Sequence, residues 1–181
     1  MRSCNKIGID AEHGRIPIDD HGATIAAVAR ERRPECRCMK VYFGFTVAGD
    51  RSSVEAAKKI VGVLQSMGHT VLTSHLLCED AWEADRRMSP QEVFARDMSW
   101  LAQCDIFVGE VSGSSFGLGF ETGYLLGGTP KKTILFYERA VERKISLLIV
   151  GNTLPNCILV PYSRLEDLEK LVHRWVPSPG T

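Results

Sequence analysis

A glycine-rich stretch between an apolar run and a helix-forming segment constrains this chain more than any other feature. Residues 105–111 are apolar enough for a buried strand, residues 113–119 hold three glycines and two serines, and residues 120–126 favour a helix. A strand, a glycine loop and a helix start in this order turn backbone N–H groups toward whatever lies above the sheet, as in anion sites. Glu121 falls near the first turn of that helix, where the helix dipole favours an ionised carboxylate. The stretch allows either a nucleophile for a phosphorylated substrate or, more commonly, an acid that only caps a helix.

The segments on both sides of this stretch alternate between strand and helix patterns. Apolar runs predict strands at residues 39–45, 69–73, 105–111, 132–137 and 157–160. Helical spacing predicts helices at residues 53–67, 90–103, 120–126, 143–150 and 163–175. Gly68 is placed to end the first helix, and Ser163 with Glu166 forms a capping-box pattern at the start of the last. The alternation predicts an α/β fold, with a doubly wound, Rossmann-like sheet of five parallel strands in a single domain.

Three parts of the chain differ in character. Residues 1–38 hold one short apolar patch among proline, glycine and charged residues, and we expect an N-terminal arm or extension there. Residues 39–176 carry the alternating pattern and form the predicted domain, and residues 177–181 form a tail. Within the domain, the long charged segment 76–89 is predicted to be a binding loop with one helical turn around residues 81–85.

Composition narrows the partners. Lys plus Arg is 22 and Asp plus Glu is 22, so the net charge of zero favours neither a nucleic-acid polymer nor an anionic membrane. No apolar run reaches the roughly 20 residues that span a bilayer, and the acidic start is unlike a secretory signal. Scattered cysteines predict a reduced, intracellular protein of the cytoplasm, with the nucleus left open. A zinc site is a weak alternative, and its candidate ligands are Cys4, Cys36, Cys38 and either His13 or His21.

The predicted topology brings three loops to one edge of the sheet. Ligands of doubly wound sheets bind beyond the carboxyl ends of the strands, at the switch point. The loop after the first strand contributes Thr46, Gly49 and Arg51, the loop after the second contributes His75, and the third is the glycine-rich stretch. Neither a GxGxxG fingerprint after the first strand nor a GxxxxGK[ST] motif occurs, so a dinucleotide or a nucleoside triphosphate is not favoured.

A second carboxylate is predicted to reach the same region from a helix. Asp97 lies inside an apolar stripe of the helix at residues 90–103, and that stripe consists of Val93, Phe94, Trp100 and Leu101. Because burial of an unpaired charge is costly, Asp97 should be paired, be protonated or face a pocket. The pattern favours the pocket, and a surface pair between Asp97 and Arg96 is the alternative.

Four short motifs in order carry a resemblance to a known family. They are Val41-Tyr-Phe43, Thr73-Ser-His75, Arg96-Asp-Met-Ser-Trp-Leu101 and Gly117-Leu-Gly-Phe-Glu-Thr-Gly123. The chain resembles the nucleoside 2-deoxyribosyltransferase superfamily over about residues 39–175, and is closest to its 2′-deoxynucleoside 5′-monophosphate N-glycosidase branch. No single motif is specific, but the ordered set is.

The resemblance implies hydrolysis of the N-glycosidic bond of a nucleotide, which gives a free base and 2-deoxyribose 5-phosphate. It implies that Glu121 attacks C1′ and forms a glycosyl-enzyme intermediate, that Asp97 assists departure of the base, and that Tyr42 positions the nucleophile and sugar. It places His75 near the base and Ser115 on the 5′-phosphate. It also implies a homodimer with a shared site, because Ser146 would reach the phosphate of the neighbouring subunit. The remaining expected substrate-binding residues are Thr46, Gly49, Arg51, Gly117 and Gly119.

A retaining sugar transfer of this kind uses two carboxyl groups, one ionised and one able to hold a proton, and we expect neither a metal nor a cofactor.

The first loop departs from the family pattern. Phe45 fills a glycine position, and Ala48 stands where an arginine would face the phosphate, with Arg51 near enough to substitute. Phe120 replaces the tyrosine that usually precedes the glutamate. Two alternatives therefore stay open: a deoxyribosyltransferase that acts on unphosphorylated deoxynucleosides, and a nucleotide-binding module without turnover. The sequence does not determine the preferred base.

Overall fold

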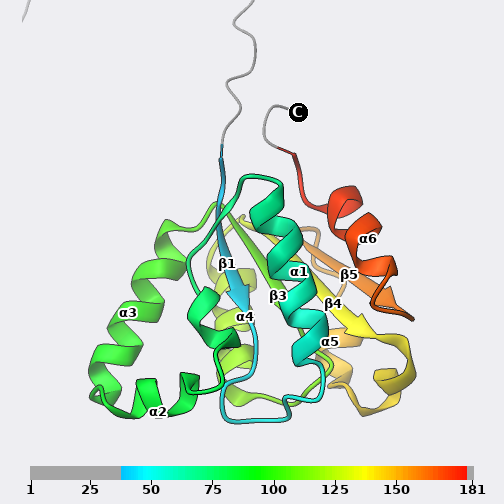
Figure 1. Cartoon of the computed structure of the whole chain (residues 1–181). Coiled ribbons are helices and arrows are strands. Elements are labelled where there is room, and N and C mark those ends of the chain that lie inside the picture. Colours follow the sequence, from blue (N-terminus) through cyan, green and yellow to red (C-terminus); the bar gives the residue numbers. More distant parts are fainter. Residues whose placement is uncertain (1–37, 179–181) are drawn as a thin grey trace, which may run out of the picture. The chain divides into compact units, whose positions relative to one another are not determined.

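The computed structural model describes residues 38–178, and they form a doubly wound α/β fold with a five-stranded parallel sheet (Figure 1). The strand order is β2-β1-β3-β4-β5, with every neighbouring pair parallel. The predicted fold class is confirmed. The strands are β1 (Lys40–Gly44), β2 (Thr70–Val71), β3 (Ile106–Glu110), β4 (Lys132–Glu138) and β5 (Cys157–Tyr162). The helices are α1 (Val54–Ser66), α2 (Ala81–Arg86), α3 (Pro90–Gln103), α4 (Phe116–Gly128), α5 (Leu147–Val150) and α6 (Asp167–Trp175).

The predicted arm, except for its last residue, and the end of the predicted tail lie outside the described residues. The same holds for the candidate zinc ligands other than Cys38. Within residues 38–178, no group of three or more His, Cys, Asp or Glu side chains could hold a metal ion. No helix in this range is long and apolar enough to cross a bilayer.

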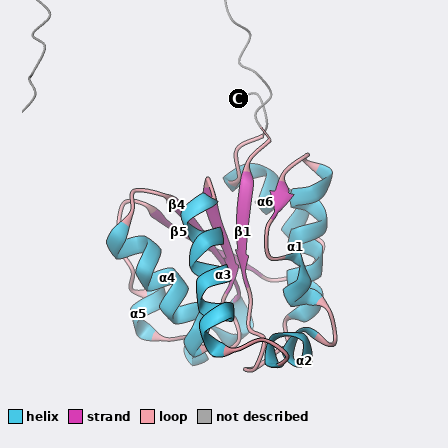
Figure 2. Ribbon diagram, turned by 90° about the vertical axis from the view of Figure 1, so that its left-hand side faces the viewer, coloured by secondary structure: helices cyan, strands magenta, loops and turns pink. Residues whose placement is uncertain are grey.

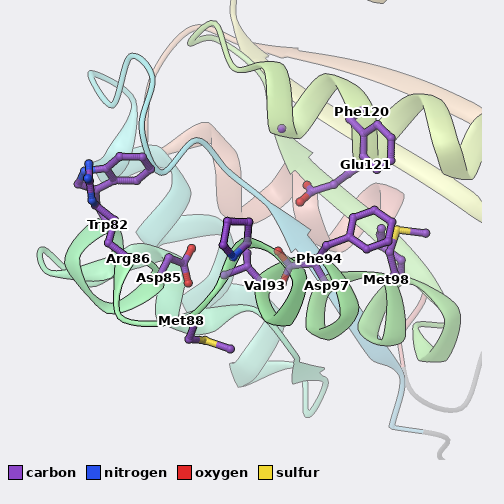
Figure 3. Close-up of a pocket in the computed structure, with 13 residues that line it drawn as sticks. Trp82, Asp85, Arg86, Met88, Val93, Phe94, Asp97, Met98, Phe120 and Glu121 are labelled. Carbon is purple, nitrogen blue, oxygen red and sulfur yellow. The ribbon is translucent and has the colours of Figure 1, made fainter.

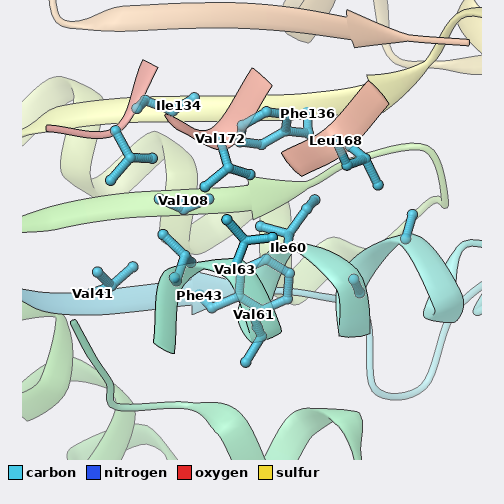
Figure 4. Close-up of a cluster of buried hydrophobic side chains, with 14 of the residues drawn as sticks. Val41, Phe43, Ile60, Val61, Val63, Val108, Ile134, Phe136, Leu168 and Val172 are labelled. Atoms are coloured by element: carbon cyan, nitrogen blue, oxygen red, sulfur yellow. The ribbon is translucent and has the colours of Figure 1, made fainter. Parts of the chain in front are cut away.

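Helices cover both faces of the sheet (Figure 2). On one face α1 and α6 pack over the strands and enclose a core that includes Val41, Phe43, Val108 and Phe136 (Figure 4). On the other face lie α3, α4 and α5. Side chains alternate along a strand, so Tyr42 points to this second face while its neighbours Val41 and Phe43 point to the first. The alternation in β1 thus delivers a phenol to the α3–α4 side.

The carboxyl edge of the sheet contains the switch point. β1 lies between β2 and β3 in the sheet. The connection that leaves β1 runs to β2 on one side of β1, and the connection that leaves β2 runs to β3 on the other side. The loops that follow β1 and β3 therefore diverge around one crevice, which is where ligands bind in such sheets.

Several boundaries differ from the predictions. α4 begins at Phe116, not at residue 120, because the hydroxyl of Ser115 caps it by accepting from the backbone N–H of Leu118 at 3.3 Å. The last helix begins at Asp167, and its N-cap side chain makes no hydrogen bond, so the predicted capping box is wrong. Gly68 ends the first helix as predicted, with a φ of 85° that favours glycine.

The second strand is also shorter than predicted, and Thr73 provides the reason. Its hydroxyl donates to the carbonyl of Phe43 at 2.7 Å and accepts from the Phe43 N–H at 2.9 Å. A side chain thereby satisfies the backbone groups of β1 that a longer β2 would have paired.

Gly44, at the end of β1, lets α4 lie close to the sheet. A Cβ on Gly44 would come within 2.5 Å of the Phe107 ring and 2.6 Å of the Leu118 side chain. The missing side chain thus accommodates the first turn of α4 against β1.

We predict that Gly44→Ala destabilises the domain by about 1–3 kcal/mol, because Phe107 and Leu118 must both shift. Gly62→Ala is the matched control, since a Cβ there meets nothing within 4 Å and Gly62 is exposed on α1. It should stabilise by up to about 1 kcal/mol through helix propensity. Urea unfolding measures both, and equal behaviour of the two variants would contradict this account of Gly44.

Candidate active site

A cavity of about 600 Å³ opens between α2, α3 and α4 (Figure 3). Its walls are mainly apolar, and they include Trp82 and Met88 from the α2 region, Phe94 from α3 and Phe120 from α4. Phe94 is 57% exposed, so the prediction that it belongs to a buried stripe is wrong. Its ring centroid lies 6.4 Å from that of Phe120. Both rings line the cavity and neither belongs to the core.

Three carboxyl groups line this cavity: Glu121 from α4, Asp97 from α3 and Asp85 from α2 (Figure 3). The side chain of Asp97 is 24% exposed, and its Oδ1 accepts from Nε of Arg96 at 2.8 Å. Asp97 therefore faces a pocket, as the pattern favoured, and its pair with Arg96 is partly buried and not a surface pair.

Tyr42 fixes Glu121 from the floor of the site. The phenol is only 1% exposed, its ring stacks on Phe107 at 5.5 Å, and its hydroxyl donates to Oε1 of Glu121 at 2.7 Å. Burial, followed by the charge of Glu121, raises the pKa of Tyr42, so the phenol stays protonated and remains a donor. A strand residue and a helix residue 79 positions apart thus meet in one hydrogen bond.

Burial raises the pKa of Glu121 to about 7, which corrects the expectation of a dipole-stabilised anion. Since α4 begins at Phe116, Glu121 lies in the second turn, beyond the reach of the helix dipole. The Tyr42 hydrogen bond and the charge of Arg96 lower this pKa, and the charge of Asp97 raises it. Desolvation is the largest of these effects, so Glu121 can take up and release a proton near neutral pH.

The glycine loops interlock beside the cavity. A Cβ on Gly49 would lie 2.1 Å from the carbonyl oxygen of Ser114, and a Cβ on Gly113 would lie 2.1 Å from that of Asp50. Only glycines permit this approach of the two loops. Thr46 is 1% exposed and its Oγ1 accepts from the Gly49 N–H at 2.8 Å, so its hydroxyl holds the loop.

Arg51 also braces this region. Its guanidinium donates to the carbonyls of Thr46 at 2.8 Å and Leu76 at 3.0 Å, and lies 5.2 Å from the ring centroid of Phe45. These contacts tie the first loop to the 3₁₀ turn Ser74–Leu77. A phosphate contact from Arg51 stays a prediction.

Of the other predicted substrate-binding residues, only Gly117 lines the cavity. A Cβ on Gly119 would meet nothing within 4 Å. His75 lies behind α3 with its ring 5.4 Å from Trp100, and burial together with the charge of Arg96 lowers its pKa. Ser146 is exposed at the start of α5 and does not line the cavity of its own chain.

Comparison with known proteins supplies the family. No protein-family model matches the chain. The chain is 40% identical over 135 residues to a protein of Thermofilum pendens that is provisionally named 2′-deoxynucleoside 5′-phosphate N-hydrolase 1, a match that covers 74% of this chain and 92% of the relative. The chain belongs to the 2′-deoxynucleoside 5′-phosphate N-hydrolase family. A second relative of this family, the 5-hydroxymethyl-dUMP N-hydrolase of Tetraodon nigroviridis, is 33% identical over 115 residues, or 62% of this chain and 80% of that protein.

A solved structure agrees on the fold. The CMP N-glycosidase of Clostridium botulinum aligns with a TM-score of 0.56 at 18% identity, over 76% of this chain and 99% of the other. The N-hydrolase assignment thus rests on sequence, and the sheet and helix arrangement is shared with an N-glycosidase.

The sequence analysis did not single out two charged side chains, the partly buried Arg96 and the buried Glu110. The sequence predicts for Arg96 only a surface pair with Asp97, and the structure adds an ion pair between its Nη1 and Asp85 at 2.8 Å. Glu110, at the end of β3, lies within the apolar run at residues 105–111. It is a buried acid, 1% exposed, for which the sequence analysis gives no role. The signal for Glu110 was an acid inside an otherwise buried strand, and the signal for Arg96 was its place beside Asp97.

Glu110 binds the loops together from the α1–α6 side. Its carboxyl oxygens accept from the hydroxyls of Ser53, Ser112 and Tyr162, the last at 3.0 Å, and from the Ser112 N–H at 3.3 Å. Ser112 in turn accepts from the Glu138 N–H at 2.8 Å. Burial raises the pKa of Glu110, although these four donors act against the increase. One acid therefore connects the ends of β3, β4 and β5 with the start of α1.

We predict that ionisation of Glu121 destabilises the fold between about pH 4.5 and pH 7. The native pKa of about 7 exceeds the ordinary value of 4.5, so the folded state holds more protons in this window and stability falls as pH rises through it. The free energy of unfolding of Glu121→Gln, relative to that of the parent, should therefore increase by roughly 1–3 kcal/mol from pH 5 to pH 8.

Urea unfolding at both pH values measures the difference, and Glu79→Gln, at an exposed position, serves as the control. A stability difference between Glu121→Gln and the parent that is constant with pH would contradict the raised pKa.

Proposed function

We propose that this protein hydrolyses the N-glycosidic bond of 2′-deoxynucleoside 5′-monophosphates to a free base and 2-deoxyribose 5-phosphate. The observation that carries the proposal is the convergence of Glu121 and Asp97 in one cavity, with Tyr42 donating to Glu121 at 2.7 Å. A retaining glycosidase uses two carboxyl groups in one cavity, and Glu121, whose pKa burial raises to about 7, is the one assigned here as the nucleophile. The family assignment supports the same bond as the target.

In the proposed reaction, an oxygen of ionised Glu121 attacks C1′ while the C1′–N bond breaks. The departing base takes the bonding electron pair and receives the proton that Asp97 carries, which leaves Asp97 as a carboxylate. Water then attacks C1′ with Asp97 as the base, and the bond between Glu121 and the sugar breaks, which regenerates the carboxylate. The Tyr42 hydroxyl holds one carboxylate oxygen, so the other is left to face the sugar.

The base end of the substrate fits the apolar part of the cavity. Trp82, Phe94 and Phe120 offer aromatic surfaces to a flat ring, with Phe94 and Phe120 adjacent at 6.4 Å. The segment that supplies Trp82 is the long loop predicted from sequence to bind, and it forms α2.

The phosphate end fits the N-terminus of α4. This helix has 13 residues and begins next to the interlocked glycine loops, so its free N–H groups and dipole favour an anion there. Ser115 and Gly117 lie in its first turn, with Gly117 also in the cavity wall. A phosphate at this point would lie on the same helix as Glu121, one turn away.

A homodimer completes the proposed site. Each serine assigned to phosphate is followed by exposed apolar side chains: Phe116, 102% exposed, after Ser115, and Leu147 and Leu148, 83% and 87% exposed, after Ser146. Such residues are covered in oligomers. A partner that covers them would bring its own Ser146 toward this phosphate site.

The function is tested by incubating the protein with deoxynucleoside monophosphates, including 5-hydroxymethyl-dUMP, and with unphosphorylated deoxynucleosides. We expect release of free base from the monophosphates. The acidic limb of kcat/KM should lie near pH 7, because Glu121 must be ionised to attack. Base exchange on nucleosides alone would favour a deoxyribosyltransferase, and binding without turnover would favour the non-catalytic module.

The glutamate intermediate is tested with rapid quenching and mass spectrometry. We expect a 2-deoxyribose 5-phosphate adduct on the peptide that contains Glu121, and none in Glu121→Gln, with kcat reduced at least roughly a thousandfold. Turnover by Glu121→Gln equal to the parent would remove Glu121 from the mechanism.

The dimer is tested with Leu148→Asp, which places a charge on an 87% exposed apolar residue. We expect a monomer by sedimentation velocity and a KM for the monophosphate raised roughly tenfold or more, because Ser146 of the partner is lost. Leu165→Asp, at a 43% exposed leucine just before α6, should stay dimeric. A Leu148→Asp dimer with parental KM would contradict the shared site.

A further inference from the structure

Arg96, which has no role among those predicted, occupies the centre of a charged cluster with Asp97 and Asp85. Its Nε donates to Asp97 at 2.8 Å and its Nη1 donates to Asp85 at 2.8 Å, so one guanidinium spans two carboxylates on different helices. The three side chains are shielded, at 18% exposure for Arg96, 16% for Asp85 and 24% for Asp97. Ion pairs this shielded hold their geometry better than exposed ones.

The guanidinium is also held from its flat face. It lies 5.0 Å from the ring centroid of Trp100, one turn along α3, and this ring in turn contacts His75. Stacking and two-sided hydrogen bonding together fix the plane of an arginine, which a lysine cannot reproduce. The orientation of Asp97 toward the cavity is therefore set by a group that is itself immobilised.

The charged and titratable groups around this centre come from every packed element. Tyr42 comes from β1, His75 from the 3₁₀ turn at Ser74–Leu77, Asp85 from α2, Asp97 from α3 and Glu121 from α4. Arg96 is the cation among them that acts on three: its charge lowers the pKa of Tyr42, His75 and Glu121. Burial lowers the pKa of Arg96, but its hydrogen bonds to Asp97 and Asp85 outweigh this and raise it, so it stays charged.

We propose that Arg96 is a positioning residue, which holds Asp97 toward the reacting bond and anchors the α2 wall of the cavity through Asp85, and that its positive charge also acts on Glu121. This inference rests on the proposed function for its kinetic consequences. Its electrostatic part concerns the free protein and stands or falls without any substrate.

The two carboxylates that bind Arg96 should have different effects on the kinetics. The Arg96–Asp97 pair should affect the chemical step, since Asp97 and Glu121 line the same cavity. The Arg96–Asp85 pair acts on the wall, since Asp85 lies on α2 with Trp82, a ring expected to meet the base. Removal of Arg96 should therefore affect kcat and the pH profile, whereas removal of Asp85 should affect mainly KM.

The test uses the full chain with four variants: Arg96→Gln, Arg96→Lys, Asp85→Asn and, as a charge control, Arg87→Gln at an exposed position just after α2. Carbon-13 NMR of labelled glutamate carboxyls follows the titration of Glu121 without substrate, with the resonance assigned by its absence in Glu121→Gln. Steady-state kinetics on a monophosphate across pH gives kcat and KM for each variant.

We expect Arg96→Gln to raise the Glu121 midpoint, because a cation that lowers it is lost, and to lower kcat roughly ten- to a hundredfold. Arg96→Lys should retain the midpoint within a few tenths and still lose kcat, because a lysine supplies the charge without the fork. Asp85→Asn should raise KM severalfold with kcat nearly unchanged, and Arg87→Gln should match the parent.

An unshifted Glu121 midpoint in folded Arg96→Gln would overturn the electrostatic role. Equal kinetic profiles for Arg96→Lys and the parent, or for Arg96→Gln and Asp85→Asn, would overturn the positioning role. Should the parent hydrolyse no nucleotide while the midpoint shifts as expected, the proposed function fails and the role of Arg96 in setting the Glu121 charge remains.

Discussion

The hydrogen bond between Tyr42 and Glu121 is the interaction on which the rest of this structure depends. A carboxyl group in desolvated surroundings is costly unless it is protonated or bonded, and here one donor at 2.7 Å meets it from the floor of the sheet. For that contact to exist, α4 must approach β1 closely, which Gly44 permits, and Tyr42 must point to the α3–α4 face, which strand alternation enforces. The Phe107 ring then locks the phenol from the side.

Four charged or titratable side chains lie in sequence above Tyr42, each next to a partner. Glu121 titrates near neutral pH, Asp97 faces it, and Arg96 lies behind Asp97 with Asp85 on its far side. Each group is held by a partner on a different element, so the arrangement exists only in the folded chain. Such preorganisation lets a small set of side chains stabilise developing charge without rearrangement.

The loops converge at the carboxyl edge of the sheet, beside the cavity. Gly49 and Gly113 allow two backbones to approach closely, and Glu110 accepts from three hydroxyls and one backbone N–H on three segments. A buried acid that receives four donors is well suited to hold irregular backbone, because loops carry N–H groups that no strand partner satisfies. The stability of the loop edge and the position of the α4 N-terminus thus share one cause.

The sequence by itself determined the α/β class and the order of strands and helices along the chain, and it named the two acids, Glu121 and Asp97, that the fold brings to one cavity. These follow from local patterns: apolar runs, the glycine after α1, and four short motifs in a fixed order. Local patterns also misled at particular places. Phe94 has helical spacing with the core residues yet lines the cavity, and the serine that caps α4 was read as loop, so Glu121 was placed a turn too early in its helix.

Only the tertiary structure decided the charge of Glu121 and the partners of Asp97. A pKa near 7 arises from desolvation by elements far apart in the chain, and no window around residue 121 contains Tyr42 or Arg96. The pairing of Arg96 with Asp85 likewise depends on how α2 folds back onto α3. Burial and long-range electrostatics are properties of packed surfaces, so they are fixed only when the sheet and its helices have assembled.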